Sequence, residues 1–122
     1  MGRMTDEIRD CINSNLVEAK ESRARGDWSR CWQLLEDAHI LSQPWPWPHT
    51  RVHSAMLVAG WRGRDRQEVL GQGLRLIVGG LASAVGRYPN GNTGRARVPA
   101  TQPMPVRPDL AEVLSRAGRP AS

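Results

Sequence analysis

The chain has 122 residues and a net charge of +5, with a sequence pI of about 10.5. This length allows one domain with a small core plus tails. Phe is absent and Trp occurs five times, so aliphatic side chains and Trp must form the core. Lys20 is the only lysine among 17 basic residues, and such heavy use of Arg is weak evidence for nucleic-acid binding.

The cysteine content and the N-terminus indicate the cellular compartment. Cys11 and Cys31 are too few for a disulfide framework and lack Cys-x-x-Cys spacing, which fits a reducing cytosol. The first residues contain early acids and no apolar run, which argues against a signal peptide. The most apolar stretch, Leu74–Val85, is shorter than the roughly 20 residues needed to cross a bilayer. We therefore expect a cytoplasmic protein without a membrane-spanning segment.

The first helix is predicted to run from the residue after Thr5 to about Ala24. Thr5 is a good N-cap, and the acids that follow it favour the helix dipole. Apolar residues then recur at helical spacing, at Ile8, Ile12, Leu16 and Ala19. Gly26 suits a left-handed C-terminal cap, so the chain should turn there.

The second helix is predicted from Trp28 to Ser42, capped by Asp27. Its apolar stripe is formed by Cys31, Leu34, Leu35, Ala38 and Leu41. Residues 24–38 resemble the second half of a tetratricopeptide repeat, which implies a hairpin of two closely packed helices. Because solenoid repeats need several units for stability and no second copy is evident, we interpret this segment as a single helical hairpin.

A third helix is predicted from Pro48 to Trp61, and Gly63 ends it. It follows a Pro-Trp turn at residues 44–48, which a helix is not expected to cross because proline removes a backbone hydrogen bond. The second and third helices should therefore meet at this turn and lie against each other.

A fourth helix is predicted to start after Asp65, with Glu68 as a capping-box acid. The helix should weaken at Gly79–Gly80 and end near Val85. Its apolar positions are Val69, Leu70, Leu74, Ile77 and Val78.

The composition changes after Arg87, where turn formers and then prolines dominate. An extended Pro-rich arm should lead to a short final helix at Asp109–Arg116, opened by a proline. The predicted fold is all-α: an antiparallel bundle of about four main helices at residues 1–87. The arm and short C-terminal helix, residues 88–122, should pack on the same domain.

All three histidines fall within fifteen residues, at His39, His49 and His53. Glu36 precedes the first to give Glu-x-x-His, and the other two form His-x-x-x-His. Residues three or four apart share one helix face, so two helices meeting at the Pro-Trp turn would bring these side chains together. Imidazole and carboxylate are transition-metal ligands, and helical bundles build metal sites from Glu-x-x-His on facing helices. The pattern predicts a metal site for Zn, Cu or Ni, which the sequence does not separate.

Two other interpretations of these side chains stay open. The histidines could be ordinary polar residues at a helix junction, where they cap carbonyls or stack on Trp45 and Trp47. They could also hold a catalytic zinc ion, with Glu36 as the general base of a hydrolase. Thr50 stands where a His-Glu-x-x-His motif has Glu, so the sequence favours a binding protein over an enzyme.

Sulfur-containing side chains near the cluster are ambiguous. Met56 lies on the same helix face as His49 and His53, where a thioether could help to hold Cu(I), although Met at helical spacing is usually part of a core. Cys31 lies on the apolar stripe of the second helix, and free Cys is commonly buried as a small hydrophobe. Cys11 lies near the inner face of the first helix. Whether Met56 or Cys31 joins the ligands is open at this point.

Three further features have ordinary structural explanations. Trp45 and Trp47 could anchor a protein partner, or their rings could cover the end of the hairpin. Arginines cluster at residues 62–66 and 87–97, but acids interrupt the first cluster and no recognition helix is evident, so nucleic-acid binding is not expected. The Gly-rich loop at residues 90–97 lacks the Gly-Lys-Ser/Thr of a P-loop and is predicted to be a structural turn.

Several segments together resemble a bacterial family of small proteins, domain of unknown function 3703. The matching segments are Ala38–Gln43, His49–Leu57, Arg64–Gln72, Gly91–Gly94 and Pro103–Leu110. They span most of residues 20–115. The resemblance implies a compact helical domain with His39, His49 and His53 at the family's own histidine positions. It also implies a setting in bacterial metal tolerance, without an established activity.

We therefore expect a bacterial, cytoplasmic protein that binds a transition metal in sequestration, delivery or sensing, through Glu36, His39, His49 and His53. The alternative is a metal-free helical module that binds a protein partner, and a metal-dependent hydrolase is the third hypothesis. A two-fold dimer could join two Glu-x-x-His motifs into a dinuclear site, so a homodimer is compatible with the pattern.

Overall fold

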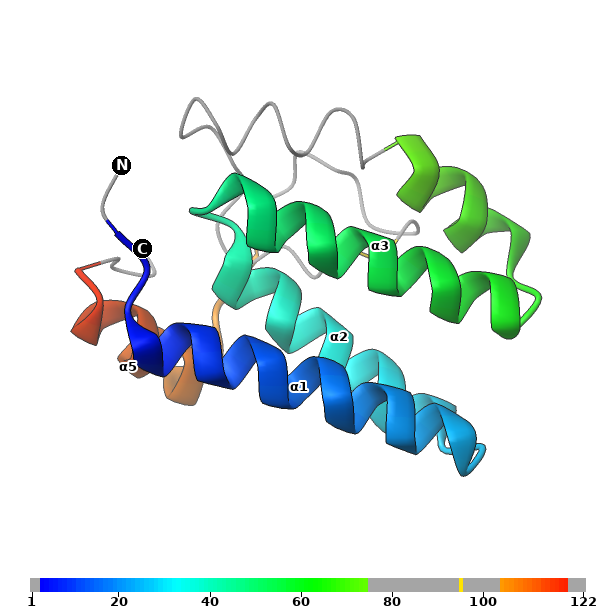
Figure 1. Ribbon diagram of the computed structural model, residues 1–122, viewed down its shortest axis with the longest axis horizontal. Helices are drawn as coiled ribbons and strands as arrows, with labels where there is room; N and C mark the ends of the chain where they lie inside the picture. The colour runs from blue at the N-terminus through cyan, green and yellow to red at the C-terminus, as the bar shows by residue number, and fades with distance from the viewer. Residues whose placement is uncertain (1–2, 75–94, 96–103, 119–122) are drawn as a thin grey trace.

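The computed structural model describes residues 3–74, 95 and 104–118, and every regular element among these residues is an α-helix. The elements are α1 (Asp6–Ala24), α2 (Trp28–Ser42), α3 (Pro46–Arg62), a helical segment at residues 66–74, and α5 (Pro108–Arg116). The first three helices lie side by side and alternate in direction, and α5 lies near the first turns of α1 (Figure 1). The predicted all-α antiparallel bundle is confirmed.

Local signals set the ends of α1 and α2. The Thr5 hydroxyl accepts a hydrogen bond of 3.3 Å from the Ile8 N–H, and Asp27 accepts one of 3.1 Å from the Arg30 N–H. Between the two helices Gly26 has a φ of 78°, in the left-handed region that glycine enters without steric cost. Both helices have the predicted bounds, because each signal is complete within a few residues.

The start of α3 corrects the predicted one, since the helix begins at Pro46 rather than Pro48. Proline is tolerated in the first turn of a helix, where the backbone N–H groups have no partner within the helix. Trp45 is the N-cap residue, and its carbonyl accepts a 3.0 Å hydrogen bond from the His49 N–H. The link between α2 and α3 is therefore only residues 43–45, which brings the start of α3 close to the end of α2.

The core lies between α1 and α2 and along the inner face of α3, with α5 closing one end. From α5, Leu110 and Leu114 contribute to it. The buried apolar residues of the three long helices are Ile8, Ile12, Ala19, Cys31, Leu34, Leu35, Ala38, Ile40, Leu41, Val52, Met56 and Ala59. None of the described helices combines the length and the hydropathy needed to cross a membrane.

Ion pairs join the C-terminal segment to the bundle. Arg107, just before α5, pairs with Asp37 on α2 at 2.9 Å. Arg116, at the end of α5, pairs with Glu7 at the start of α1 at 2.5 Å. The short final helix is present as predicted, with a proline at its start.

The helical segment at residues 66–74 turns back over α3 (Figure 1) and approaches it closely at Gly60. A Cβ atom at this position would lie 2.9 Å from the Glu68 Cβ, so only glycine fits without displacing the segment. The turn places Arg64 at a φ of 57°. Asp65 caps the segment, as predicted, by accepting a 3.2 Å hydrogen bond from the Glu68 N–H.

Some sequence predictions fall outside the described residues. These are the end of the fourth helix near Val85, its weak point at Gly79–Gly80, and most of the loop at residues 90–97. The division at residue 87 into a bundle and an arm also stays a prediction.

Candidate metal centre

His39, His49 and His53 converge in the interior of the bundle. His39 belongs to the last turns of α2, and the other two lie one turn apart on α3. Their Nε2 atoms form a nearly equilateral triangle, with sides of 2.9 Å (39–49), 3.0 Å (49–53) and 3.1 Å (39–53). The rings meet at steep angles rather than stacking, and all three residues are buried. The structure therefore brings the three predicted histidines together.

The triangle has a size that suits a transition-metal ion. With sides of 2.9–3.1 Å, each nitrogen lies about 1.7 Å from the centre, which is less than the Zn–N bond length of roughly 2.0–2.1 Å. An ion can therefore contact all three nitrogens from just outside their plane, with one side left for another ligand. Protons alone fit this arrangement poorly, because a neutral imidazole has either a proton or a lone pair at Nε2, so hydrogen bonds can account for at most two of the three sides of the triangle.

Gln72 sets the protonation of one of these rings. The His53 Nδ1 lies 2.5 Å from the Gln72 Oε1, and the Gln72 Nε2 donates a 3.0 Å hydrogen bond to the Glu68 Oε2. The contact with a carboxylate fixes which end of the amide is nitrogen, so the amide oxygen faces the ring. His53 must then donate from Nδ1, which leaves the Nε2 lone pair directed at the triangle. Such outer hydrogen bonds are typical of metal-bound histidines.

Glu68 and Arg95 continue this arrangement outward. The Glu68 side chain is fully buried, and its Oε1 accepts a 2.5 Å hydrogen bond from the Arg95 Nε. The Arg95 guanidinium also lies 3.8 Å from the centre of the Trp32 ring, in a cation–π contact. A buried carboxylate is costly unless it is paired and hydrogen-bonded, and Arg95 supplies that pairing.

Glu36, the fourth predicted ligand, has a different neighbour. Its carboxylate lies 3.6 Å from the Arg95 guanidinium. Among the described residues, the set of ligand atoms within 4.8 Å of one another contains the three histidines and not Glu36. Burial raises the pKa of the Glu36 carboxyl, and the charge of Arg95 opposes that rise. The structure thus places Glu36 beside the network of Glu68 and Arg95.

Among the described residues, neither cysteine belongs to this set of His, Cys, Asp and Glu ligand atoms. Cys31 is buried in the apolar core, and burial raises the pKa of its thiol. Cys11 is partly buried, and burial raises the pKa of its thiol as well. Thiols with raised pKa values are poor metal ligands and poor nucleophiles. Met56 is a fully buried core residue of α3.

The two tryptophans of the Pro-Trp turn have opposite environments. Trp45 is buried and is the N-cap residue of α3, which fits the interpretation that its ring covers the end of the hairpin rather than anchoring a partner. Trp47 is 83% exposed. The hypothesis of a protein partner at this turn therefore depends on Trp47 alone.

Sequence reasoning missed Gln72 and Arg95 and gave Glu68 only a capping role. In the segment at residues 66–74, Glu68 and Gln72 are buried while Leu70 and Leu74 are exposed. The available signal was the spacing of Glu68 and Gln72, which places both on one helix face. Nothing local to these residues indicates that this face meets the histidines.

A comparison with protein families matches residues 6–114 to the family described as "Protein of unknown function (DUF3703)". The chain belongs to this family. The match extends from the start of α1 into α5 and includes the three histidines, so the resemblance noted in the sequence is confirmed. No protein of curated function and no solved structure matches the chain. The likeness of the hairpin of α1 and α2 to a tetratricopeptide repeat stays a prediction.

Proposed function

We propose that this protein binds one transition-metal ion through His39, His49 and His53 and serves in metal sequestration, delivery or sensing. The observation that carries the proposal is the triangle of three buried Nε2 atoms, 2.9–3.1 Å apart. Three imidazole nitrogens this close together match the convergence of ligands on one cation, because a metal ion accepts a lone pair from each nitrogen.

The donor set selects the class of metal. Imidazole nitrogen suits Zn²⁺, Cu and Ni, whereas Mg²⁺ and Ca²⁺ require oxygen ligands. Zn²⁺ is our first expectation, because three histidines plus one exchangeable ligand form a common zinc site. All three ligands are neutral when bound, so the ion keeps its positive charge and attracts an anionic fourth ligand. A ligand from a partner protein in that position would suit delivery or sensing.

The ion would also act as a tie between helices. His39 lies on α2 and the other two ligands on α3, while Gln72 connects His53 to the segment at residues 66–74. Binding that requires the folded arrangement stabilises the fold, by about 2.7 kcal/mol when free metal is 100 times the dissociation constant. A metal-dependent change in stability is therefore part of the proposal.

The first test is elemental analysis of the untagged protein as purified, with His39→Ala and His53→Ala as variants. We expect close to one equivalent of Zn, Cu or Ni in the native protein and none in either variant. Ser42→Ala is the matched control, because Ser42 is buried beside His39 and its hydroxyl donates to the His39 carbonyl. Absence of metal, together with no thermal shift on adding Zn²⁺, Ni²⁺, Cu²⁺ or Cu⁺, would overturn the proposal.

Glu36 decides between two versions of this site. If Glu36 is a fourth ligand, its carboxylate would have to leave the Arg95 guanidinium and bind the ion instead. Glu36→Gln would then weaken metal binding. If Glu36 is instead the general base of a hydrolase, which is our third hypothesis, the substitution Glu36→Gln should leave metal binding unchanged and abolish turnover of ester or phosphoester substrates. Measuring the metal content and the hydrolysis of generic nitrophenyl substrates for the same variant separates the two roles.

A second candidate function is a protein-interaction module, favoured by the exposure of Trp47. A groove of about 270 Å³ lies beside it, lined by Met4, Arg9, Ile12, Asn13, Trp47, Pro48 and Arg51. Large aromatic residues next to such grooves are frequent anchors of interfaces. If this function holds without metal, partner capture should survive chelation and be lost in Trp47→Ala.

A further inference from the structure

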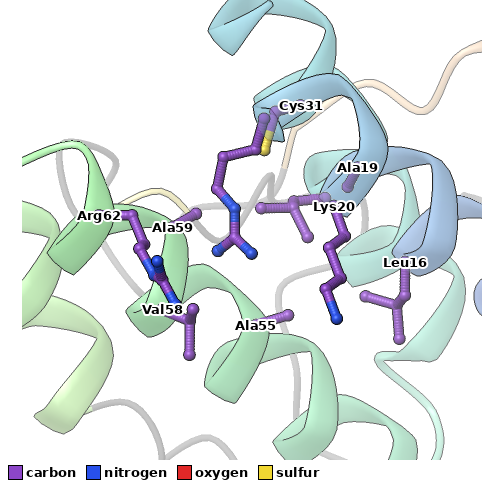
Figure 2. Close-up of a pocket in the computed structure, with 10 residues that line it drawn as sticks. Leu16, Ala19, Lys20, Cys31, Ala55, Val58, Ala59 and Arg62 are labelled. Atoms are coloured by element: carbon purple, nitrogen blue, oxygen red, sulfur yellow. The ribbon is translucent and has the colours of Figure 1, made fainter. Parts of the chain in front are cut away.

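A second groove lies between α1, α2 and α3, closer to the start of α2 than the histidines are. Its volume is about 330 Å³, and it shares no lining residue with the metal centre. Side chains of all three helices surround it (Figure 2). The apolar part of the lining consists of Leu16, Ala19, Cys31, Leu35, Ala55, Val58 and Ala59.

Three basic side chains complete the lining of this groove. Lys20 and Arg23 come from α1, and Arg62 comes from the last turn of α3. Figure 2 shows Lys20 and Arg62 on opposite sides of the groove. No acidic residue lines it, and within the described part of the chain no ion pair includes any of these three cations. Three positive charges therefore surround an apolar floor without a counter-charge in its lining.

The one ionisable group on the floor adds no negative charge. Burial raises the pKa of the Cys31 thiol, and this effect outweighs the opposing charge of Arg23. The thiol is therefore neutral near pH 7 and behaves as part of the apolar surface. The groove as a whole is positive at its edge and apolar at its base.

We propose that this groove binds a small amphipathic anion, namely a carboxylate that carries a hydrocarbon tail. The head group would lie against Lys20, Arg23 and Arg62, and the tail would cover the apolar floor. Ligand pockets typically combine an apolar lining with a few charged groups that orient the ligand, and volumes start at roughly 300 Å³. Arg presents parallel N–H groups that match the two oxygens of a carboxylate.

The ligand needs both a charged head group and an apolar tail, because the groove has both a positive edge and an apolar floor. An inorganic anion would satisfy the three cations but leave the apolar floor in water. A neutral hydrocarbon would cover the floor but leave the cations without a partner. Only a molecule with a charged head and an apolar body matches the arrangement of side chains in the groove.

The test is isothermal titration of the full chain with decanoate below its micelle concentration. We expect saturable binding of one decanoate per chain, weakened by added salt, and at least tenfold weaker binding in the double variant Arg23→Gln/Arg62→Gln. The matched control is Arg25→Gln/Arg30→Gln, which removes the same charge at two exposed positions outside both grooves and should bind decanoate like the native protein. Ala55→Leu, which fills the floor without changing charge, should also weaken binding.

Three outcomes would each overturn the proposal. Decanoate binding could be absent, it could fall equally in both double variants, or decanol could bind as tightly as decanoate. Circular dichroism of each variant establishes that it is folded, and the exposed position of Arg62 favours folding. The titration is repeated with chelator and with His53→Ala. Unchanged decanoate affinity there shows that this site stands even if the metal site fails.

Discussion

The two halves of α2 both bury apolar side chains, but only the second half also buries polar ones. The first half buries apolar core residues alone, such as Leu34, while the second half buries the polar residues His39 and Ser42 next to core residues such as Leu41. Burial of apolar surface stabilises the fold directly, at about 25 cal/mol per Å². Burial of polar groups costs free energy unless every group has a partner. Both halves of α2 therefore support the fold, and only the second half also carries the cost of buried polar groups.

This comparison predicts different responses to metal. His49→Ala should abolish metal binding, because it removes one corner of the Nε2 triangle. Adding Zn²⁺ should raise the melting temperature of the native protein and leave that of the variant unchanged. Thermal unfolding with and without chelator measures both effects. Equal thermal shifts in the two proteins would show that the histidines do not hold the ion.

The first half of α2, which buries no polar residue, should not respond to metal. Leu34→Ala removes a buried side chain from the core, which typically costs about 2–5 kcal/mol of unfolding free energy. The loss should be the same with and without chelator, since Leu34 is a core residue and not one of the three proposed ligands. Urea unfolding measures it, and Leu70→Ala at a 76% exposed position is the control, with an expected change within about 0.5 kcal/mol. A chelator-dependent loss in Leu34→Ala would contradict the separation of the two halves.

A smaller effect tests the outer hydrogen bonds of the polar half. Gln72→Met keeps the length of the side chain but removes the acceptor for the His53 Nδ1 proton. We expect metal affinity to fall by about 10–100-fold, as is usual when the partner of a ligating histidine is lost. Competition with a chromophoric chelator gives the affinity. Gln67→Met, at an exposed position of the same helical segment, is the control and should leave the metal affinity unchanged. An equal fall in affinity in Gln67→Met would show that Gln72 does not act on the metal site.

The smallest effect concerns the attachment of α5. Burial raises the pKa of Asp37, and hydrogen bonding to Arg107 opposes that rise. Because its pKa in the folded state is raised, Asp37 costs stability as pH increases above its ordinary value of 3.8. Arg107→Gln removes the opposing interaction, so it should lower stability by up to about 1 kcal/mol at neutral pH and by less below pH 4.

The same variant has a second readout at Asp109. Hydrogen bonding to Arg107 lowers the pKa of Asp109 to about 2, and this pKa should return toward 3.8 in Arg107→Gln. An NMR titration of the Asp109 carboxyl measures it. Arg9→Gln, whose partner Asp6 lies at 2.7 Å in an exposed pair, is the control and should change neither quantity.

Local sequence determined the helices and the grouping of the histidines. The bounds of α1 and α2 follow from Thr5, Asp27 and Gly26, because a cap or a left-handed turn depends on residues within three or four positions. The spacing of His49 and His53 places them on one face of α3 for the same reason. The start of α3 was predicted two residues late because Pro46 was assigned to the turn before the helix, although the first turn of a helix accepts proline.

Tertiary structure alone decided which groups surround the histidines. Gln72 meets His53 across nineteen residues and Arg95 meets Glu68 across twenty-seven, and no local pattern specifies contacts over such separations. The same holds for Glu36, which the structure places beside Arg95. The sequence by itself determined that three histidines share a helical hairpin. Packing of the segment at residues 66–74 on α3 decided which of its faces is buried, because the close approach at Gly60 turns its polar side inward.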